Sequence, residues 1–275
     1  MNENYRILQI IKVIIYIFLL FIMVYPLFWV VVSSVKTNAD LVANPFGLPV
    51  NPQFENITKL WLEGDFPNYF LNSLVISIIT VVGIVSMSTM AGYVFAQRKG
   101  GVINFLFIFF LIGLMIPGEV VIVPVFRIIA WLELRNTLTG VILVYLAGTS
   151  FSIIIMRTYF LSIPKEIGEA ALVDGASEFA VFYRIYLPLS APAMVTIAIF
   201  AFFSSWNDLL WPLILIQDTD SFTLQQGVLR FQDEFTIDWS MRSAGLVFSI
   251  LPPLIFYLIF NRGIQKGLTA GAIKI

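Results

Sequence analysis

The chain has 275 residues, of which 59% are hydrophobic and only 12% are charged, and its formal net charge is −1. Soluble domains are about 45–50% apolar and about 25% charged, so this composition excludes an ordinary soluble domain and predicts a membrane protein. The chain contains no cysteine and no histidine, and no stretch fits a phosphate-binding Gly-rich loop. We therefore expect no catalytic residues and no metal site, and any energy-driven work must draw its energy from another chain.

Six long apolar stretches free of Asp, Glu, Lys and Arg follow one another along the chain. Each reaches or approaches the ~20 residues with which a helix crosses ~30 Å of hydrocarbon. The third is the shortest, but its helix can continue past Glu119 through "VVIVPVF". We predict an all-α integral membrane protein with a single transmembrane domain over residues 1–275. The predicted spans are residues 10–33, 70–96, 102–126, 136–158, 185–216 and 242–262.

The distribution of Lys and Arg predicts the orientation of the chain. With the amino terminus inside, ten of the 16 cationic residues fall in inner segments and six in outer ones. This excess places both termini of a multi-pass protein in the cytoplasm, together with the loop 164–184 between the fourth and fifth spans. The outer loop 34–69 is rich in Pro and Gly, and we expect one short helix in it near Ile57–Leu62.

The loop 164–184 belongs to a charged stretch, "EIGEAALVDGASEFAVFYRIYLP" at residues 166–188. Pro164 and Glu166 favour the start of a helix, Gly175 offers a left-handed stop, and Ser177 is a good cap for a second helix. We predict an exposed helix-turn-helix. The alternative, an amphipathic helix on the lipid surface, would bring four acidic side chains to anionic headgroups.

This stretch resembles the signature of bacterial ABC-importer permeases, Glu-Ala-Ala followed at fixed spacing by Gly, Ile and Leu-Pro. The resemblance implies a type I importer permease fold in which the segment is a coupling helix that sits in a cleft of the ATP-binding subunit. The coupling residues it implies are Glu169, Ala170, Ala171, Asp174, Gly175, Ile185, Leu187 and Pro188.

Further motifs resemble the smaller, six-helix permease of the maltose-type carbohydrate uptake family, among them "NYFLNSLVIS", "MIPGEVVIVPVF", "WNDLLWPLIL" and "GLTAGAIKI". This resemblance implies import of a di- or oligosaccharide across the bacterial cytoplasmic membrane. The implied partners are a second homologous permease, two ABC ATPase subunits and an extracytoplasmic sugar-binding protein. ATP and Mg²⁺ would be bound by the ATPase subunits, with no cofactor on this chain, which would not be an enzyme by itself. The resemblance also implies a tail that contacts the ATPases, although a frayed terminus is the alternative: Gly267, Leu268, Thr269, Ala270 and Gly271.

Flat rings and hydrogen-bonding groups gather near the outer end of the fifth span, at Trp206, Asn207, Asp208 and Trp211. Such side chains suit a polyhydroxylated solute, and the alternative is an interfacial aromatic belt. A carboxylate in mid-membrane is costly, so Asp208 is expected to face a pore or the outer water. Glu119 follows a break expected at Pro117–Gly118 and is either a pathway residue or a solvated surface residue.

Three other functions remain open from the residues. An ABC permease for a non-sugar solute would share the coupling signature. A secondary transporter or channel that works without ATP would show charges in the helix centres and repeat-related broken helices, and the sequence indicates neither. A structural membrane anchor would leave the spacing of Gly175 and Pro188 unexplained.

Overall fold

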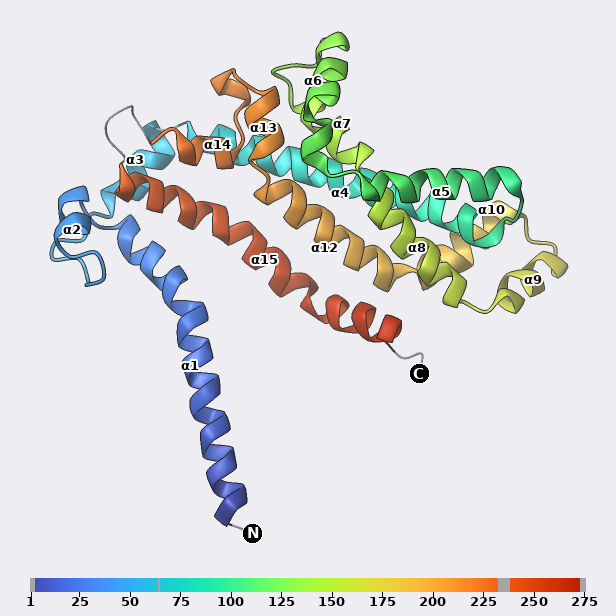
Figure 1. Ribbon diagram of the computed structural model, residues 1–275, viewed down its shortest axis with the longest axis horizontal. Helices are drawn as coiled ribbons and strands as arrows, with labels where there is room; N and C mark the ends of the chain where they lie inside the picture. Colours follow the sequence, from blue (N-terminus) through green and yellow to red (C-terminus); the bar gives the residue numbers. More distant parts are fainter. Residues whose placement is uncertain (1–2, 64, 232–237, 273–275) are drawn as a thin grey trace. The chain divides into compact units, whose positions relative to one another are not determined.

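The computed structural model describes residues 3–63, 65–231 and 238–272, with side chains for 7–62, 65–231 and 238–260. Throughout these ranges the regular structure is helical (Figure 1). The chain divides into two compact units, Met1–Pro67 with Gly227–Leu251 and Asn68–Gln226 with Pro252–Ile275. The boundaries fall within three helices, α4 (Phe66–Gln97), α14 (Leu224–Leu229) and α15 (Trp239–Ala272). The predicted all-α fold class is confirmed.

The first unit contains α1 (Glu3–Ser34), α2 (Asn38–Ala43), α3 (Glu55–Glu63) and the first part of α15. The short helix expected near Ile57–Leu62 is confirmed by α3. Helix α2 was not predicted, because six residues give too short a pattern; it begins where the Thr37 hydroxyl accepts a hydrogen bond from the Asp40 amide, at 3.1 Å. Asn38 fastens α2 to the start of α15, donating to Asp238 (3.0 Å) and accepting from the Ser240 amide (3.1 Å).

A buried polar cluster stabilises the segment between α1 and α3 in this unit. Lys36 is fully buried, and its ammonium donates to the Asn44 carbonyl at 2.7 Å. The Asn56 amide donates to the backbone carbonyls of Ser34 and Lys36 at 3.1 and 2.9 Å. One side chain thus satisfies two carbonyls at the end of α1, which would otherwise be left partly unpaired.

Replacing Asn56 by alanine is expected to destabilise this unit by about 1–3 kcal/mol, because both carbonyls lose their donor in a half-buried site. The measurement is the apparent unfolding temperature of the detergent-purified protein. Asn51→Ala is the matched control, since Asn51 is an exposed residue of the same loop. Equal unfolding temperatures for the two variants would show that the Asn56 hydrogen bonds contribute nothing to stability.

In the second unit, three pairs of described helices are bent at short breaks. Each pair is a candidate membrane span, in addition to the long unbroken helices. In the described parts of the chain, α1, α4 and α15 are long and apolar enough to cross a membrane unbroken, and up to six spans result if each bent pair counts as one. The bends are 96° between α5 (Gly101–Met115) and the turn η1 (Gly118–Val121) with α6 (Ile122–Trp131), 45° between α7 (Leu138–Ala147) and α8 (Ser150–Ser162), and 70° before α12 (Ala191–Asn207). The chain is a multi-pass membrane protein, and the span limits stay predictions.

Each bend has a local cause. Pro117 keeps Ile116 extended (ψ 114°), which ends α5 at the break expected from the sequence. Gly148 and Thr149 interrupt the fourth stretch, and the Thr149 hydroxyl donates to the Leu146 carbonyl. Ser190 lies between Pro188 and Pro192, where it caps the end of the preceding helical turn and the start of α12. The break at Pro117–Gly118 was expected, whereas the other two bends were not predicted, because glycine and proline are ordinary in membrane helices and do not by themselves reveal a bend.

The core of the second unit forms where α4, α8 and α12 pack. Its buried members include Ile84, Met156, Phe160, Tyr186 and Ile197. Within this unit α9 (Lys165–Val173) and α10 (Glu178–Val181) lie at one end, while α6, α7 and α13 (Leu210–Leu215) lie at the other (Figure 1). The core therefore connects two regions that the sequence singled out separately.

Candidate functional site

The charged stretch forms the predicted helix-turn-helix. Helix α9 begins directly after Pro164 and ends at Asp174. Gly175 follows with a φ of +86°, and the Ala176 amide closes the turn on the Ala171 carbonyl at 2.9 Å. The Ser177 hydroxyl accepts from the Ala180 amide at 3.2 Å and caps α10. The left-handed glycine stop and the serine cap are thus confirmed.

The exposed surface of α9 and its turn mixes apolar and acidic groups. Glu169, Ala170, Asp174 and Gly175 are exposed. Val173 beside them is 88% exposed. The large apolar side chains of Ile167 and Leu172 on α9, and of Phe179 on α10, are also exposed. Within the described part of the chain, a Cβ atom added at Gly175 would meet no atom within 4 Å beyond its two chain neighbours, so it is the backbone conformation that requires glycine here. Such a face is chemically suited to a soluble partner.

On the side turned toward the core, α9 packs on Tyr186, a contact that we call the Tyr186 seat. A Cβ atom at Gly168 would lie 2.9 Å from the Tyr186 hydroxyl oxygen, so this glycine permits the close approach of helix and ring. Tyr186 is buried and contacts the rings of Tyr93 on α4 and Phe160 on α8, with centroids 5.1 and 6.0 Å away. This seat was not predicted from the sequence, although Gly168 in "EIGEAA" interrupts an otherwise helical run and could have indicated it.

The remaining signature residues lie on the inner side or in the following turn. Ala171 and Ile185 pack against the core cluster of the second unit. Ala171 therefore supports the seat of α9. Leu187 and Pro188 belong to α11 (Leu187–Leu189), which continues the π-helical turn η2 (Phe182–Tyr186). The Leu187 carbonyl accepts from the Ser190 hydroxyl at 2.9 Å, at the 70° bend into α12.

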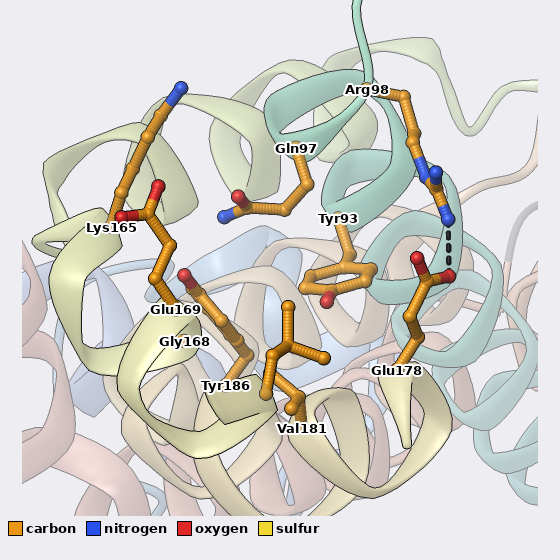
Figure 2. Close-up of a pocket in the computed structure, with 10 residues that line it drawn as sticks. Tyr93, Gln97, Arg98, Lys165, Gly168, Glu169, Glu178, Val181 and Tyr186 are labelled. Carbon is orange, nitrogen blue, oxygen red and sulfur yellow. Dashed lines mark hydrogen bonds and ion pairs between the residues drawn. The ribbon is translucent and has the colours of Figure 1, made fainter. Parts of the chain in front are cut away.

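A polar cavity of about 250 Å³ separates the end of α4 from α9 and α10. Figure 2 shows the Gln97 amide facing Lys165 and Glu169 on one side, the Tyr93 ring in the middle, and Arg98 reaching Glu178 on the other side. Arg98 and Glu178 form an exposed ion pair, which contributes little to stability in water. The pair links Glu178 at the start of α10 to Arg98, the residue that follows α4.

A second cavity, of about 480 Å³, lies about 20 Å further along α4, at the level of Thr80 and Ile84. It brings together four of the five residues proposed for a solute pathway, Glu119, Asn207, Asp208 and Trp211. The Asp208 carboxylate accepts from the Tyr145 hydroxyl at 2.7 Å and from the Leu210 amide at 3.0 Å. These contacts fix the carboxylate at the break between α12 and α13.

Trp206 does not line this cavity. Its side chain is 1% exposed, stacks on Phe202 and meets Phe70 edge-on, with both ring centroids 5.7 Å away. This position corrects the expectation that Trp206 faces a solute, and it equally disagrees with the belt alternative. The ring of Trp211 lies at the cavity instead, together with hydroxyl-bearing side chains that the sequence analysis missed: Thr80, Tyr145, Ser204 and Ser205.

The tail residues Gly267–Gly271 form part of the last turns of α15 by their backbone, and their side chains lie outside the described residues. Their predicted contact with ATPase subunits stays a prediction. Among the described residues, no group of three His, Cys, Asp or Glu side chains is arranged to hold a metal ion.

Known proteins similar to this chain are membrane permeases. The chain is 35% identical over 261 residues to the arabinooligosaccharides transport system permease protein AraQ of Halalkalibacterium halodurans, covering 94% of this chain and 93% of AraQ. It is 32% identical over 256 residues to the diacetylchitobiose uptake system permease protein NgcG of Streptomyces coelicolor, covering 92% and 85% of the two chains.

The fold is similar to a chain in the crystal structure of a bacterial ABC transporter involved in the import of the acidic polysaccharide alginate. The TM-score is 0.83 at 22% identity, over 95% of this chain and 98% of that one. Residues 88–269, which include α9, the Tyr186 seat and most of the second cavity, match a family described as the inner membrane component of binding-protein-dependent transport systems. This match covers more than half of the chain, and two permeases are more than 30% identical to it along nearly its whole length. The chain therefore belongs to the family of binding-protein-dependent transport system inner membrane components.

Proposed function

We propose that this chain is the transmembrane permease subunit of an ATP-driven importer that carries a di- or oligosaccharide across the cytoplasmic membrane. The observation that carries the solute class is the likeness to AraQ and NgcG, which are named for uptake of two different oligosaccharides and match over nine-tenths of this chain. The chain is not an enzyme by itself, and ATP with Mg²⁺ is bound and hydrolysed on partner subunits.

The exposed face of α9 receives the ATPase subunit in this proposal. A soluble partner would bury apolar side chains such as Leu172 and Val173, which gains roughly 25 cal/mol for each Å² removed from water. The neighbouring carboxylates of Glu169 and Asp174 would set the docking register by their charge.

Movement of the ATPase subunit would reach the membrane helices through the Tyr186 seat. Gly168 holds α9 directly on the Tyr186 ring, and this ring packs on Tyr93 and Phe160. Because packed cores transmit displacement and do not deform continuously, a shift of α9 is expected to move η2, α12 and the neighbouring part of α4 together.

The proposed assembly contains a second homologous permease, two ABC ATPase subunits and an extracytoplasmic sugar-binding protein. Both termini lie in the cytoplasm, so that α9 faces the ATPase. The single domain spans residues 1–275. A role for the binding protein is consistent with the family description.

The test is to purify the chain with its natural partners, reconstitute the complex in proteoliposomes, and measure ATP hydrolysis and solute uptake. The panel contains neutral di- and oligosaccharides, with amino acids and phosphate as competing solutes. At least one glycan is expected to stimulate hydrolysis and to accumulate inside. Stimulation by a non-sugar solute alone would favour the other importer class, and uptake that persists without ATP would favour a secondary transporter.

Asn207→Ala is expected to raise the KM for sugar uptake about two- to ten-fold, because the cavity loses one hydrogen-bonding side chain. ATPase binding should be unchanged, since Asn207 lies far along the core from α9. Asn104→Ala is the matched control, as Asn104 is exposed on α5 and does not line the cavity. Identical KM values for native protein and Asn207→Ala would remove Asn207 from the pathway.

A further inference from the structure

The charged side chains that line the second cavity are both acidic. Glu119 stands on η1, at the 96° bend after α5, and Asp208 stands at the end of α12. The other lining residues are polar, aromatic or aliphatic, and none of them is a lysine or an arginine. A hollow whose walls are of low dielectric focuses the field of such charges on whatever enters it.

Among the described residues, neutral donors hold the Asp208 carboxylate in place, and no ion pair involves it. Its two oxygens accept from the Tyr145 hydroxyl and the Leu210 amide, which are both neutral donors. These bonds orient the carboxylate without cancelling its charge. Glu119 is exposed at the cavity, and no described ion pair involves it.

The cavity also contains an unused hydrogen-bonding group. Thr80 lines it from α4 and is 1% exposed, and its hydroxyl has no hydrogen-bond partner among the described residues. Buried polar groups are nearly always paired, so this hydroxyl can take part in a hydrogen bond with a group that enters the cavity. Together with Asn207, Ser204 and the ring of Trp211, it forms a lining suited to a ligand rich in hydroxyl groups.

We propose that this cavity selects uncharged oligosaccharides and rejects acidic ones built from uronic acids. The proposal rests on the sugar-import function above and adds the charge class of the solute. A sugar carboxylate entering the cavity would meet two like charges and would lose water without gaining a cationic partner. The likeness to a chain from an importer of an acidic polysaccharide, at 22% identity, shows the fold alone and carries no argument about the side chains that line this cavity.

The experiment compares matched ligands that differ only in charge. Neutral tetrasaccharides, α- and β-linked, are paired with the same tetrasaccharides oxidised at C6 to uronates. Binding to the complete importer in nanodiscs is measured by equilibrium dialysis with radiolabelled sugar, without the binding protein, whose own selectivity would mask the permease. The neutral member of at least one pair is expected to bind at least about ten-fold more tightly than its oxidised form, and this ratio should fall as salt is raised.

The double variant Glu119→Gln with Asp208→Asn should shrink the ratio to about two-fold, because both like charges are gone. Asp220→Asn, which removes an exposed acid outside the cavity, should leave the ratio as in the native protein. Equal binding of neutral and oxidised sugars by the native complex would overturn the charge selection and leave sugar import standing. A ratio untouched by the double variant would likewise overturn it. Failure of every sugar to bind would overturn the proposed role of the cavity in sugar import as well.

Discussion

Replacing Gly175 by valine is expected to reduce solute-stimulated ATP hydrolysis of the reconstituted importer about ten-fold or more. The φ of +86° at this position is unfavourable for a residue with a Cβ atom by about 1–2 kcal/mol, and most unfavourable for a β-branched one. The turn after α9 would relax to another conformation and displace Asp174 and Val173, which belong to the proposed docking face. Because Gly175 is exposed and lies outside the predicted spans, insertion and pairing with the second permease should persist.

Three further variants separate backbone from charge at the same face. Gly175→Asn should retain most of the stimulation, since asparagine tolerates the left-handed region. Glu169→Lys should lower stimulation by reversing a contact with the ATPase, whereas Glu169→Gln should be milder. A pull-down of the second permease accompanies each activity measurement. Native stimulation in both Gly175→Val and Glu169→Lys would contradict the coupling role, and loss of pairing would indicate a structural role for the turn.

Replacing Gly168 by valine is expected to have an effect of similar size through the opposite face of α9. A side chain at Gly168 would overlap the Tyr186 ring, whose hydroxyl oxygen lies 2.9 Å from the Cβ position. The ring is confined by Tyr93 and Phe160, so α9 must lift, at a cost of roughly 1–3 kcal/mol for overpacking. The ATPase subunits should still bind, but their hydrolysis should no longer respond to solute.

A double-variant comparison tests the contact itself. Gly168→Ala should weaken the coupling moderately, and Tyr186→Phe, which removes the crowding oxygen, should restore part of it in the same chain. Coupling is measured as the ratio of ATPase activity with and without the stimulating solute. An unchanged ratio in Gly168→Val would show that the seat of α9 on Tyr186 does not transmit movement.

Local signals in the sequence were sufficient for the helix-turn-helix. Gly175 and Ser177 act on backbone groups within four residues, so their types alone indicated a left-handed stop and a cap. The seat of α9 was not predictable in this way. Gly168 and Tyr186 are 18 residues apart, and only the folding of α10 and η2 back along α9 brings them together.

The second cavity shows the same limit. Glu119 and Asp208 were each singled out because a membrane charge needs a polar surrounding, but nothing in the sequence indicated that they share one cavity. Trp206 and Trp211 looked equivalent from the sequence. The break at Asp208, where ψ is 131°, separates them, so that one ring enters the core and the other lies at the cavity. Which way each ring points depends on that break and not on residue type.

The measurement that tests the central claim most directly is the labelling of a single cysteine at Val173. The native chain has no cysteine, and Val173 is 88% exposed on α9, so Val173→Cys offers one accessible thiol to a membrane-impermeant maleimide. Asn51→Cys, in the loop 34–69 that is predicted to lie outside, is the matched control. We expect no labelling of Val173→Cys in intact cells, strong labelling in inverted vesicles stripped of ATPase subunits, and protection when the subunits are added back. Asn51→Cys should be labelled in intact cells and not in sealed inverted vesicles, and the ATPase subunits should not protect it. Labelling of Val173→Cys from outside the cell, or labelling that the ATPase subunits leave unchanged, would contradict the account.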